Sequence, residues 1–296
     1  MNSDTVKSGV ARMAARSLLM GAGYREKDLD KPFVGIANSF APFFPGHMHL
    51  DRIAKAVAEG VWAAGGTPME FNTIAICDGL ANGHQGMKYS LPSREIIADS
   101  VESMARAHCF DALVLITSCD KITPGMMMAA ARLDIPAIIV NGGPMLAGRW
   151  EEGPLDLVGI GRCKGRVIQA KLNDEQRGIV ENEACPGCGS CAGMFTANSM
   201  GCMSEVLGMS LPGNGTIPAV HAGRLRLARE SGERAVEMIH EGLCPSKIMT
   251  RTTFLNAIAV DMLIGCSTNT TLHLPAIAHE LGCDISLRDF DALSSK

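Results

Sequence analysis

The feature of this sequence that most constrains its fold is an alternation of short apolar runs with longer stretches of helical periodicity. The apolar runs have the length and the β-branched content of buried strands, and they cover residues 31–37, 70–77, 111–117 and 135–140. Between them, residues 49–64 and 93–108 place apolar side chains at helical spacing, and another helix is expected to begin near Pro124. This succession predicts an α/β domain with a mostly parallel sheet, in three αβα layers.

Two further regions differ from this pattern. Residues 145–180 are the most polar and irregular part of the chain, and we expect them to form a surface excursion. Residues 219–283 have mainly helical periodicity and predict a helical region that follows the sheet.

The composition excludes several classes of partner. A hydrophobic fraction of 47% and a charged fraction of 20% indicate a folded globular protein. The net charge of -4 and the absence of a basic run with interleaved aromatics argue against nucleic acid as a partner. The apolar runs are too short to span a membrane, and the first residues do not resemble a secretory signal, so we expect a cytoplasmic protein.

Polar clusters follow the predicted strands at their carboxyl ends. These clusters are Asn38-Ser39, Asp78-Gly79, Cys119-Asp120-Lys121 and Asn141-Gly142-Gly143. Ligands of parallel sheets bind just beyond the carboxyl ends of the strands. We therefore expect one composite site, assembled from several loops.

Cysteine is abundant, with 11 residues in a chain that we expect in a reducing compartment. Cys185, Cys188 and Cys191 are spaced three apart, so their thiols can converge on an iron–sulfur cluster. Zinc, a redox dithiol and buried structural cysteines are the alternatives. Cys109, Cys202 and Cys283 are predicted to be packing residues.

Oxygen ligands accompany the thiols. Asp78 and Asp120 can bind Mg²⁺ beside Lys121, although a solvated Asp–Lys pair beside a core cysteine is the simpler interpretation. Arg94 can hold a carboxylate in a bidentate pair or form an ordinary surface ion pair. A hard-metal site next to a thiolate site suits the elimination of water, because one metal can hold the substrate while iron takes the leaving hydroxyl.

Other motifs are weaker. The Gly-rich turn over residues 212–215 can cradle a phosphate or simply form a tight turn. His47 and His49 flank Met48 and are candidate site residues, but either can equally be a hydrogen-bonded core or surface histidine.

Several long motifs resemble the dihydroxy-acid dehydratase family. They include P-G-H-M-H-L, F-N-T-I-A-I-C-D-G-L-A-N-G-H-Q-G-M, Y-S-L-P-S-R-E, S-C-D-K-I-T-P-G-M, C-P-G-C-G-S-C-A-G-M-F-T-A-N-S-M, L-P-G-N-G and G-C-S-T-N-T. The sister branch of sugar-acid dehydratases, including phosphogluconate dehydratase, shares the C-D-K and T-A-N features. The P-G-H-x-H-L and S-L-P-S-R-E segments are more similar to the branched-chain amino-acid branch.

The resemblance implies an iron–sulfur and Mg²⁺-dependent hydro-lyase acting in valine and isoleucine biosynthesis. It implies Cys119 and Cys191 as cluster ligands, with Asp78, Asp120 and a carbamylated Lys121 as Mg²⁺ ligands. The implied reaction converts 2,3-dihydroxy-3-methylbutanoate, or its pentanoate homologue, into the 2-oxo acid. The predicted substrate-binding residues are Arg94, Ser39 and His49.

Two departures from the family pattern matter. Members with a [2Fe-2S] cluster carry a third cysteine where this chain has Gly46, so the cluster is expected as [2Fe-2S] or [4Fe-4S], with Cys188 or Cys185 as candidate extra ligands. Family chains are also nearly twice as long, and their catalytic base lies in a β-rich C-terminal domain that this sequence, read as an N-terminal α/β domain over 1–296, lacks. No catalytic base is therefore assigned here.

The resemblance also bears on partners. It implies a homodimer for the full-length protein and leaves open a separate C-terminal half as a partner of this chain. A sugar-acid dehydratase and a non-catalytic metal-binding fragment are the rival hypotheses.

Overall fold

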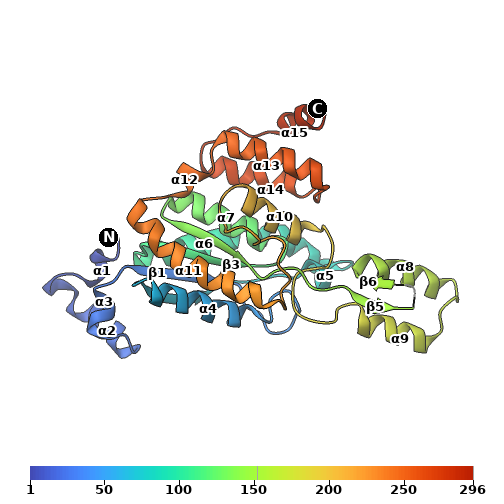
Figure 1. Ribbon diagram of the computed structural model, residues 1–296, viewed down its shortest axis with the longest axis horizontal. Helices are drawn as coiled ribbons and strands as arrows, with labels where there is room; N and C mark the ends of the chain where they lie inside the picture. Colours follow the sequence, from blue (N-terminus) through green and yellow to red (C-terminus); the bar gives the residue numbers. More distant parts are fainter. Residues whose placement is uncertain (152, 296) are drawn as a thin grey trace.

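The centre of the molecule is a parallel sheet of four strands (Figure 1). The computed structural model describes residues 1–151 and 153–295. Along the sheet the order is β2-β1-β3-β4, and the strands are β1 (Phe33–Asn38), β2 (Thr67–Asn72), β3 (Ala112–Thr117) and β4 (Ala137–Asn141). All neighbouring strands run parallel, as the sequence predicted.

Among the four strands of the sheet, β2 departs most from its predicted bounds. It begins at Thr67 rather than at residue 70, and it ends at Asn72 instead of continuing to residue 77. Asn72 pairs with Asn38, the last residue of β1, so the chain beyond it has no neighbouring strand to bond. Residues 73–77 therefore leave the sheet as a loop, which leads into α5 (Asp78–Ala81).

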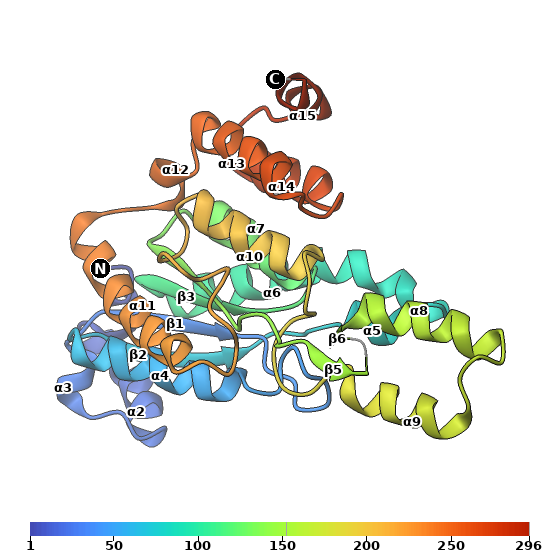
Figure 2. The ribbon, with the colours of Figure 1, turned by 45° about the vertical axis from the view of Figure 1, so that its right-hand side comes forward.

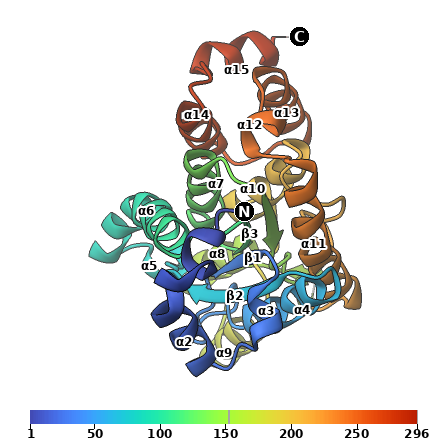
Figure 3. The ribbon, with the colours of Figure 1, turned by 90° about the vertical axis from the view of Figure 1, so that its left-hand side faces the viewer.

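Helices cover both faces of the sheet, as the predicted αβα layers require (Figure 3). The helices α4 (Leu50–Ala63) and α11 (Ala222–Glu241) pack with Val34 and Ile36 on one face. On the other face, α6 (Ser90–His108) and α7 (Ile122–Leu133) pack with Phe33 and Ala37. Successive residues of β1 thus enter opposite cores, which explains why its apolar run is continuous.

The helical region lies beyond α7 (Figures 1 and 2). It consists of α10 (Thr196–Val206), α12 (Pro245–Ile248), α13 (Arg251–Ile264), α14 (Thr270–Glu280) and α15 (Leu287–Ser294). Met200, Phe254 and Leu274 from this region are fully buried in the same core as α7. The region therefore extends the main core rather than forming one of its own.

The segment 145–180 projects from the end of the sheet (Figure 2). The irregularity expected there was wrong, because it contains the hairpin β5 (Gly148–Trp150) and β6 (Gly153–Leu155), the helix α8 (Leu157–Ile168) and most of α9 (Asp174–Glu183). Asp156 and Asn173 cap the two helices through their side chains. A small separate core of Leu155, Cys163, Leu172, Val180 and Ala184 holds them together.

Short helices complete the chain. At the N-terminus are α1 (Asp4–Lys7), a 3-10 turn (Val10–Arg12), α2 (Met13–Gly21) and α3 (Glu26–Leu29), and a second 3-10 turn (Gln85–Tyr89) precedes α6. Among the described residues, no helix is long and apolar enough to cross a membrane. The four strands end at one edge of the sheet, and the loops that follow them build the candidate site there.

Candidate active site at the carboxyl edge of the sheet

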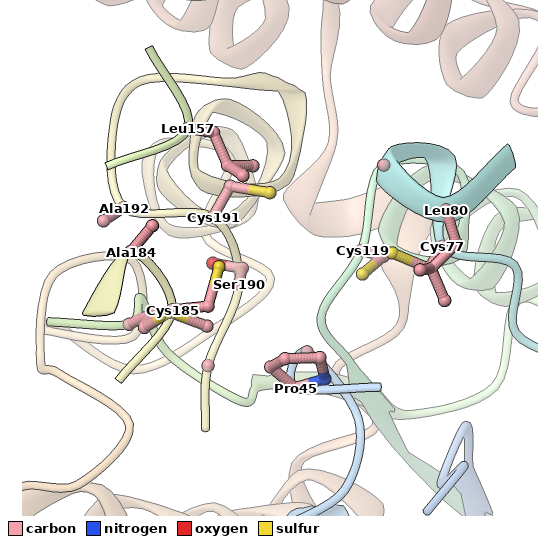
Figure 4. A pocket seen from close by; sticks show the side chains of 14 residues that line it. Pro45, Cys77, Leu80, Cys119, Leu157, Ala184, Cys185, Ser190, Cys191 and Ala192 are labelled. Atoms are coloured by element: carbon pink, nitrogen blue, oxygen red, sulfur yellow. The ribbon is translucent and has the colours of Figure 1, made fainter. Parts of the chain in front are cut away.

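Four cysteines line one cavity of about 200 Å³ beside the strand ends. Figure 4 shows Cys77 and Cys119 on one side of this cavity, with Cys185 and Cys191 on the other. Cys119 is buried, Cys77 and Cys191 are half-buried, and Cys185 is exposed. We call these four side chains the thiol cluster.

His47 fixes the loop that carries Cys119. Its Nδ1 lies 2.5 Å from the carbonyl oxygen of Ser39, and its Nε2 lies 3.0 Å from the backbone N–H of Cys119. Burial lowers the pKa of His47 to about 4, so the ring is neutral at pH 7. The neutral ring therefore donates from Nδ1 to Ser39 and accepts at Nε2 from Cys119, and it holds two loops together.

Backbone hydrogen bonds fix the loop that carries Cys191. Ser190 exchanges bonds with the chain after β4, accepting from the N–H of Met145 at 2.8 Å and donating to the carbonyl of Gly143 at 3.0 Å. Gly189 has a φ of +126°, and a Cβ there would lie 2.5 Å from the backbone nitrogen of Met145. Only glycine permits this close approach, which brings Cys191 to the cavity.

The protonation of the thiols follows from their surroundings. Interaction with Cys119 lowers the pKa of Cys77 to about 6, whereas the same interaction and burial raise the pKa of Cys119. Burial raises the pKa of Cys191 to about 12. Since two of these thiols resist ionisation in the protein alone, a soft metal centre would have to displace their protons on binding.

The thiol cluster fits an iron–sulfur cluster in its donor chemistry. Thiolates are the usual ligands of such clusters, and the cavity wall around these sulfurs is otherwise mainly apolar or backbone. The buried hydroxyl of Ser118 has no hydrogen-bond partner within the described ranges, and it precedes Cys119 directly. A bound cluster would offer that hydroxyl an acceptor.

Oxygen ligands gather on the other side of the same loops. The Lys121 Nζ lies 2.9 Å from Oδ2 of Asp78 and 3.7 Å from Oδ2 of Asp120, and Lys121 is only 5% exposed. The hydroxyl of Ser90 donates to Oδ1 of Asp78 at 2.6 Å. Burial and the neighbouring Asp78 raise the pKa of Asp120. Asp78, Asp120 and Lys121 thus lie together, and we call these three side chains the oxygen cluster. Their binding of Mg²⁺ stays a prediction.

The oxygen cluster fits a divalent cation, with one condition. Two carboxylates already enclose a positive charge, the ammonium of Lys121, at the place where a metal ion would sit. In residues 1–151 and 153–295 no group of three or more His, Cys, Asp or Glu side chains is close enough to hold a single metal ion. A carbamate on Lys121 would add an anionic oxygen to the two carboxylates.

A second cavity of about 470 Å³ joins the two clusters. Its wall includes Asp78 and Asp120 together with Cys77, Cys119 and Cys191, which also line the first cavity. The rest of this wall consists of four apolar side chains, two amides and a glycine, namely Met87, Leu157, Val158, Phe195, Asn82, Asn269 and Gly79. A small ligand in this space would touch carboxylates, thiols and apolar surface at once.

The three predicted substrate-binding residues lie outside both cavity walls. Ser39 is buried and its hydroxyl donates to the carbonyl of Ile116 at 2.8 Å. The Nε2 of His49 lies 2.9 Å from the carbonyl of Gly142. The guanidinium of Arg94 bonds Glu95 and lies 3.2 Å from Nδ1 of His273. Their contact with substrate stays a prediction.

The structure also places the remaining motifs. Cys185 lines the thiol cavity, whereas Cys188 does not. In the turn over residues 212–215, the amides of Gly213 and Gly215 donate to the carboxylate of Glu205 at 2.9 Å and 3.0 Å, so they are not free to cradle a phosphate. Cys202 and Cys283 pack against the main core, as predicted, while Cys109 follows the end of α6.

One residue of the site was missed by the sequence interpretation. The sequence analysis assigned no role to Cys77, yet its thiol belongs to the thiol cluster. The signal was the dipeptide Cys-Asp, which occurs at Cys77-Asp78 and again at Cys119-Asp120.

The fold and the site define a class of α/β proteins with soft and hard ligands side by side at the carboxyl edge of a parallel sheet. The chain belongs to the dihydroxy-acid/6-phosphogluconate dehydratase N-terminal family, whose sequence profile matches residues 31–296. This finding confirms the resemblance seen in the motifs.

Curated relatives named dihydroxy-acid dehydratase align with nearly the whole chain. The relative from Halothermothrix orenii is 60% identical over 296 residues, which are 100% of this chain and 54% of that protein. One from Desulfosudis oleivorans is 56% identical over 97% of this chain and 52% of its own length. A sequence from Clostridium pasteurianum is 54% identical over 96% of this chain and 100% of its own length. The chain thus spans about half the length of the first two relatives.

Proposed function

We propose that this chain carries the metal-binding part of a dihydroxy-acid dehydratase. The reaction takes a proton from C2 and hydroxide from C3 of 2,3-dihydroxy-3-methylbutanoate or the pentanoate homologue. Water leaves, and the enol product tautomerises to the 2-oxo acid that leads to valine or isoleucine.

The observation that carries the proposal is the shared origin of the two ligand clusters. Cys77-Asp78 and Cys119-Asp120 each send a thiol to one cavity and a carboxylate to the oxygen cluster. Soft and hard ligands are thereby held one residue apart, on loops at the ends of strands. This arrangement suits an elimination in which one substrate must meet two different metal centres.

The residues of this chain divide the work between them. Cys119 and Cys191 would hold the iron–sulfur cluster, and Asp78, Asp120 and a carbamylated Lys121 would hold Mg²⁺. When bound, the cluster is a Lewis acid for the leaving hydroxyl, and Mg²⁺ holds the carboxylate and acidifies C2. The hydroxyl of Ser90 orients the carboxylate of Asp78. The ring of His47 accepts a hydrogen bond from the backbone N–H of Cys119 and so fixes the position of that residue.

The second cavity favours a branched aliphatic acid over a sugar acid phosphate. Its described wall contains no arginine or lysine to bind a phosphate, and it presents the side chains of Leu157, Val158 and Phe195. A methyl or ethyl branch on C3 would pack against such a surface. The proposal therefore names the branched-chain substrates rather than 6-phosphogluconate.

The base that removes the C2 proton is not assigned in this chain. None of the described residues that line the two cavities is a histidine, and the cavity carboxylates are those placed on Mg²⁺. We propose that the base comes from the region of the longer relatives beyond the matched half.

An anaerobic assay tests the proposal. Protein reconstituted with ferrous iron, sulfide and Mg²⁺ is incubated with 2,3-dihydroxy-3-methylbutanoate, alone and together with the separately produced second half of a full-length relative. We expect 2-oxo acid from the mixture and little or none from the chain alone, since loss of a positioned base costs on the order of 10²–10⁴ in rate. A chain that binds no iron, or a mixture without turnover, would refute the proposal. Zinc in place of iron and sulfide would favour the rival, a non-catalytic metal-binding module.

A further inference from the structure

We infer that Cys77 is a third thiolate ligand of the iron–sulfur cluster, beside Cys119 and Cys191. The inference rests on the proposed function and names a ligand that the motifs did not assign. It answers the question raised by Gly46, where this chain has no thiol to offer.

The position of Cys77 places its sulfur against Cys119. Figure 4 shows the two side chains together on one side of the cavity, with their sulfurs adjacent. Cys77 has extended backbone angles, with φ of -90° and ψ of 108°, so the side chains of Cys77 and Asp78 leave the chain in different directions. The thiol enters the cavity, while the carboxylate of Asp78 reaches Lys121.

The sulfur of Cys77 lies beside the start of α5. A Cβ at Gly79 would stand 3.7 Å from this sulfur, which is an ordinary van der Waals distance.

The two cavities separate Cys77 from Cys185, the other candidate. Cys77, Cys119 and Cys191 line both cavities, whereas Cys185 lines only the first. Cys185 is also the exposed member of the thiol cluster. A cluster held by the three shared thiols would therefore face the space that the oxygen cluster also borders, where a substrate can reach it.

Three protein thiolates leave one position open. Both common cluster types take four protein ligands when they are fully ligated. With Cys77, Cys119 and Cys191 as ligands, one position would stay without a protein ligand and would be available to a substrate oxygen. A fourth protein thiolate from Cys185 would close that position.

Gly46 shows why the third thiol comes from the Cys77 loop. A Cβ at residue 46 would stand 2.7 Å from the sulfur of Cys119 and 3.7 Å from the hydroxyl of Ser118. A side chain at this position would therefore require Cys119 to move. The glycine leaves the buried sulfur of Cys119 in contact with Cys77 instead.

Thiol alkylation of the wild-type chain tests the inference without any substitution. The protein is reconstituted anaerobically with ferrous iron and sulfide, treated with iodoacetamide, and mapped by mass spectrometry, with chelator-stripped protein as the reference. We expect alkylation of Cys77 to slow by at least about tenfold on loading, because a metal-bound thiolate is not free to react. Cys185 should react alike in both samples.

Substitutions provide the second measurement. Cys77→Ser should lower bound iron and sulfide by at least about tenfold. Loss of a residue that only supports a metal ligand already weakens metal binding by about 10-fold to 100-fold, and loss of a ligand should cost at least as much. Cys185→Ser removes the competing thiol and should keep both, as should the matched control Cys202→Ser, which lies against the main core. Circular dichroism should show all three variants folded. Cys77→Ser with wild-type iron, or Cys77 alkylated equally with and without the cluster, would overturn the inference while leaving the proposed function intact. Failure of the wild-type chain to take up iron and sulfide would overturn both.

Discussion

The thiol cluster and the oxygen cluster are built from the same two dipeptides, yet they differ in how their charge is balanced. On the oxygen side, the ammonium of Lys121 lies within 4 Å of both carboxylates and compensates them before any metal binds. On the sulfur side, no described cation lines the cavity, and burial keeps Cys119 and Cys191 protonated. The oxygen cluster thus contains its own cation, the ammonium of Lys121, whereas the thiol cluster has no cation beside it among the described residues.

This difference shows how a Cys-Asp dipeptide can direct a thiol to one site and a carboxylate to another. Each Cys-Asp pair serves two sites, although Cys77 has extended backbone angles and Cys119-Asp120 lie in a bend and a turn before α7. The sulfur side also needs distant loops, because Cys191 is held by backbone bonds near Gly143 and Met145. The oxygen side is more local, with Asp120 and Lys121 adjacent and Asp78 held by Ser90. Metal loss on one side should therefore leave the other largely intact.

The largest effect is expected from removal of a thiol. Cys119→Ser and Cys191→Ser should each abolish bound iron, sulfide and the brown colour, because serine is a poor ligand for iron in such a cluster. The matched controls are Cys202→Ala and Cys283→Ala, which lie in the main core and should keep their iron. Iron analysis and absorbance spectra of anaerobically purified protein measure this. Full iron content in both serine variants would disprove the assignment.

The next effect concerns the oxygen side alone. Asp120→Asn removes one of the two carboxylates beside Lys121 and should weaken divalent-ion binding by more than about 100-fold, beyond the range found for residues that only support a ligand. Titration with Mn²⁺, followed by electron paramagnetic resonance, measures the affinity. Iron content should stay at the wild-type level. A parallel loss of iron would mean that the two sides are not independent.

Lys121 should switch from opposing the metal to binding it. As an ammonium it repels a divalent cation, whereas a carbamate formed with carbon dioxide adds an anionic oxygen. We therefore expect bicarbonate to tighten Mn²⁺ binding by about 10-fold to 100-fold, comparable to other changes around a metal site. Lys121→Met should lose this dependence on bicarbonate. Native mass spectrometry should detect the added carbon dioxide in the wild type, and an affinity indifferent to bicarbonate would contradict the switch.

The sequence predicted the fold better than the fine structure of the site. Strands β1, β3 and β4 could be predicted from their uninterrupted apolar runs, because helices cover both faces of the sheet and both faces of these strands are buried. The end of β2 was misjudged because it depends on where β1 ends, which is a property of the pairing rather than of the segment. The helices of the segment 145–180 were missed although Asp156 and Asn173 carried the signals of their caps.

Within the site, Asp78, Cys119, Asp120, Lys121 and Cys191 were predicted, whereas Cys77 and the supporting residues were not. The convergence of Asp78, Asp120 and Lys121 follows from their places after β2 and β3, two strands that flank β1 and end at the same edge of the sheet. The role of His47 could not be read from the sequence, because it depends on a hydrogen bond to the backbone of Cys119, 72 residues away. The same holds for Ser90, whose hydroxyl reaches Asp78 only after α6 has packed.

The smallest predicted effect on metal affinity comes from the hydrogen bond between Ser90 and Asp78. Ser90→Ala removes the hydroxyl that donates to Oδ1 of Asp78 at 2.6 Å and should weaken Mn²⁺ binding by about tenfold, because the carboxylate loses its orientation. Ser93→Ala is the matched control. Its hydroxyl is also buried in α6, but it donates to the backbone carbonyl of Ser90 and touches neither cluster. Both variants lose a buried hydroxyl and should lose similar thermal stability. A difference between their Mn²⁺ affinities therefore reports on the contact with Asp78. Iron content should be unaffected in both, since Ser90 reaches only the oxygen side. Equal Mn²⁺ affinities in the two variants would show that the contact with Asp78 does not orient a metal ligand.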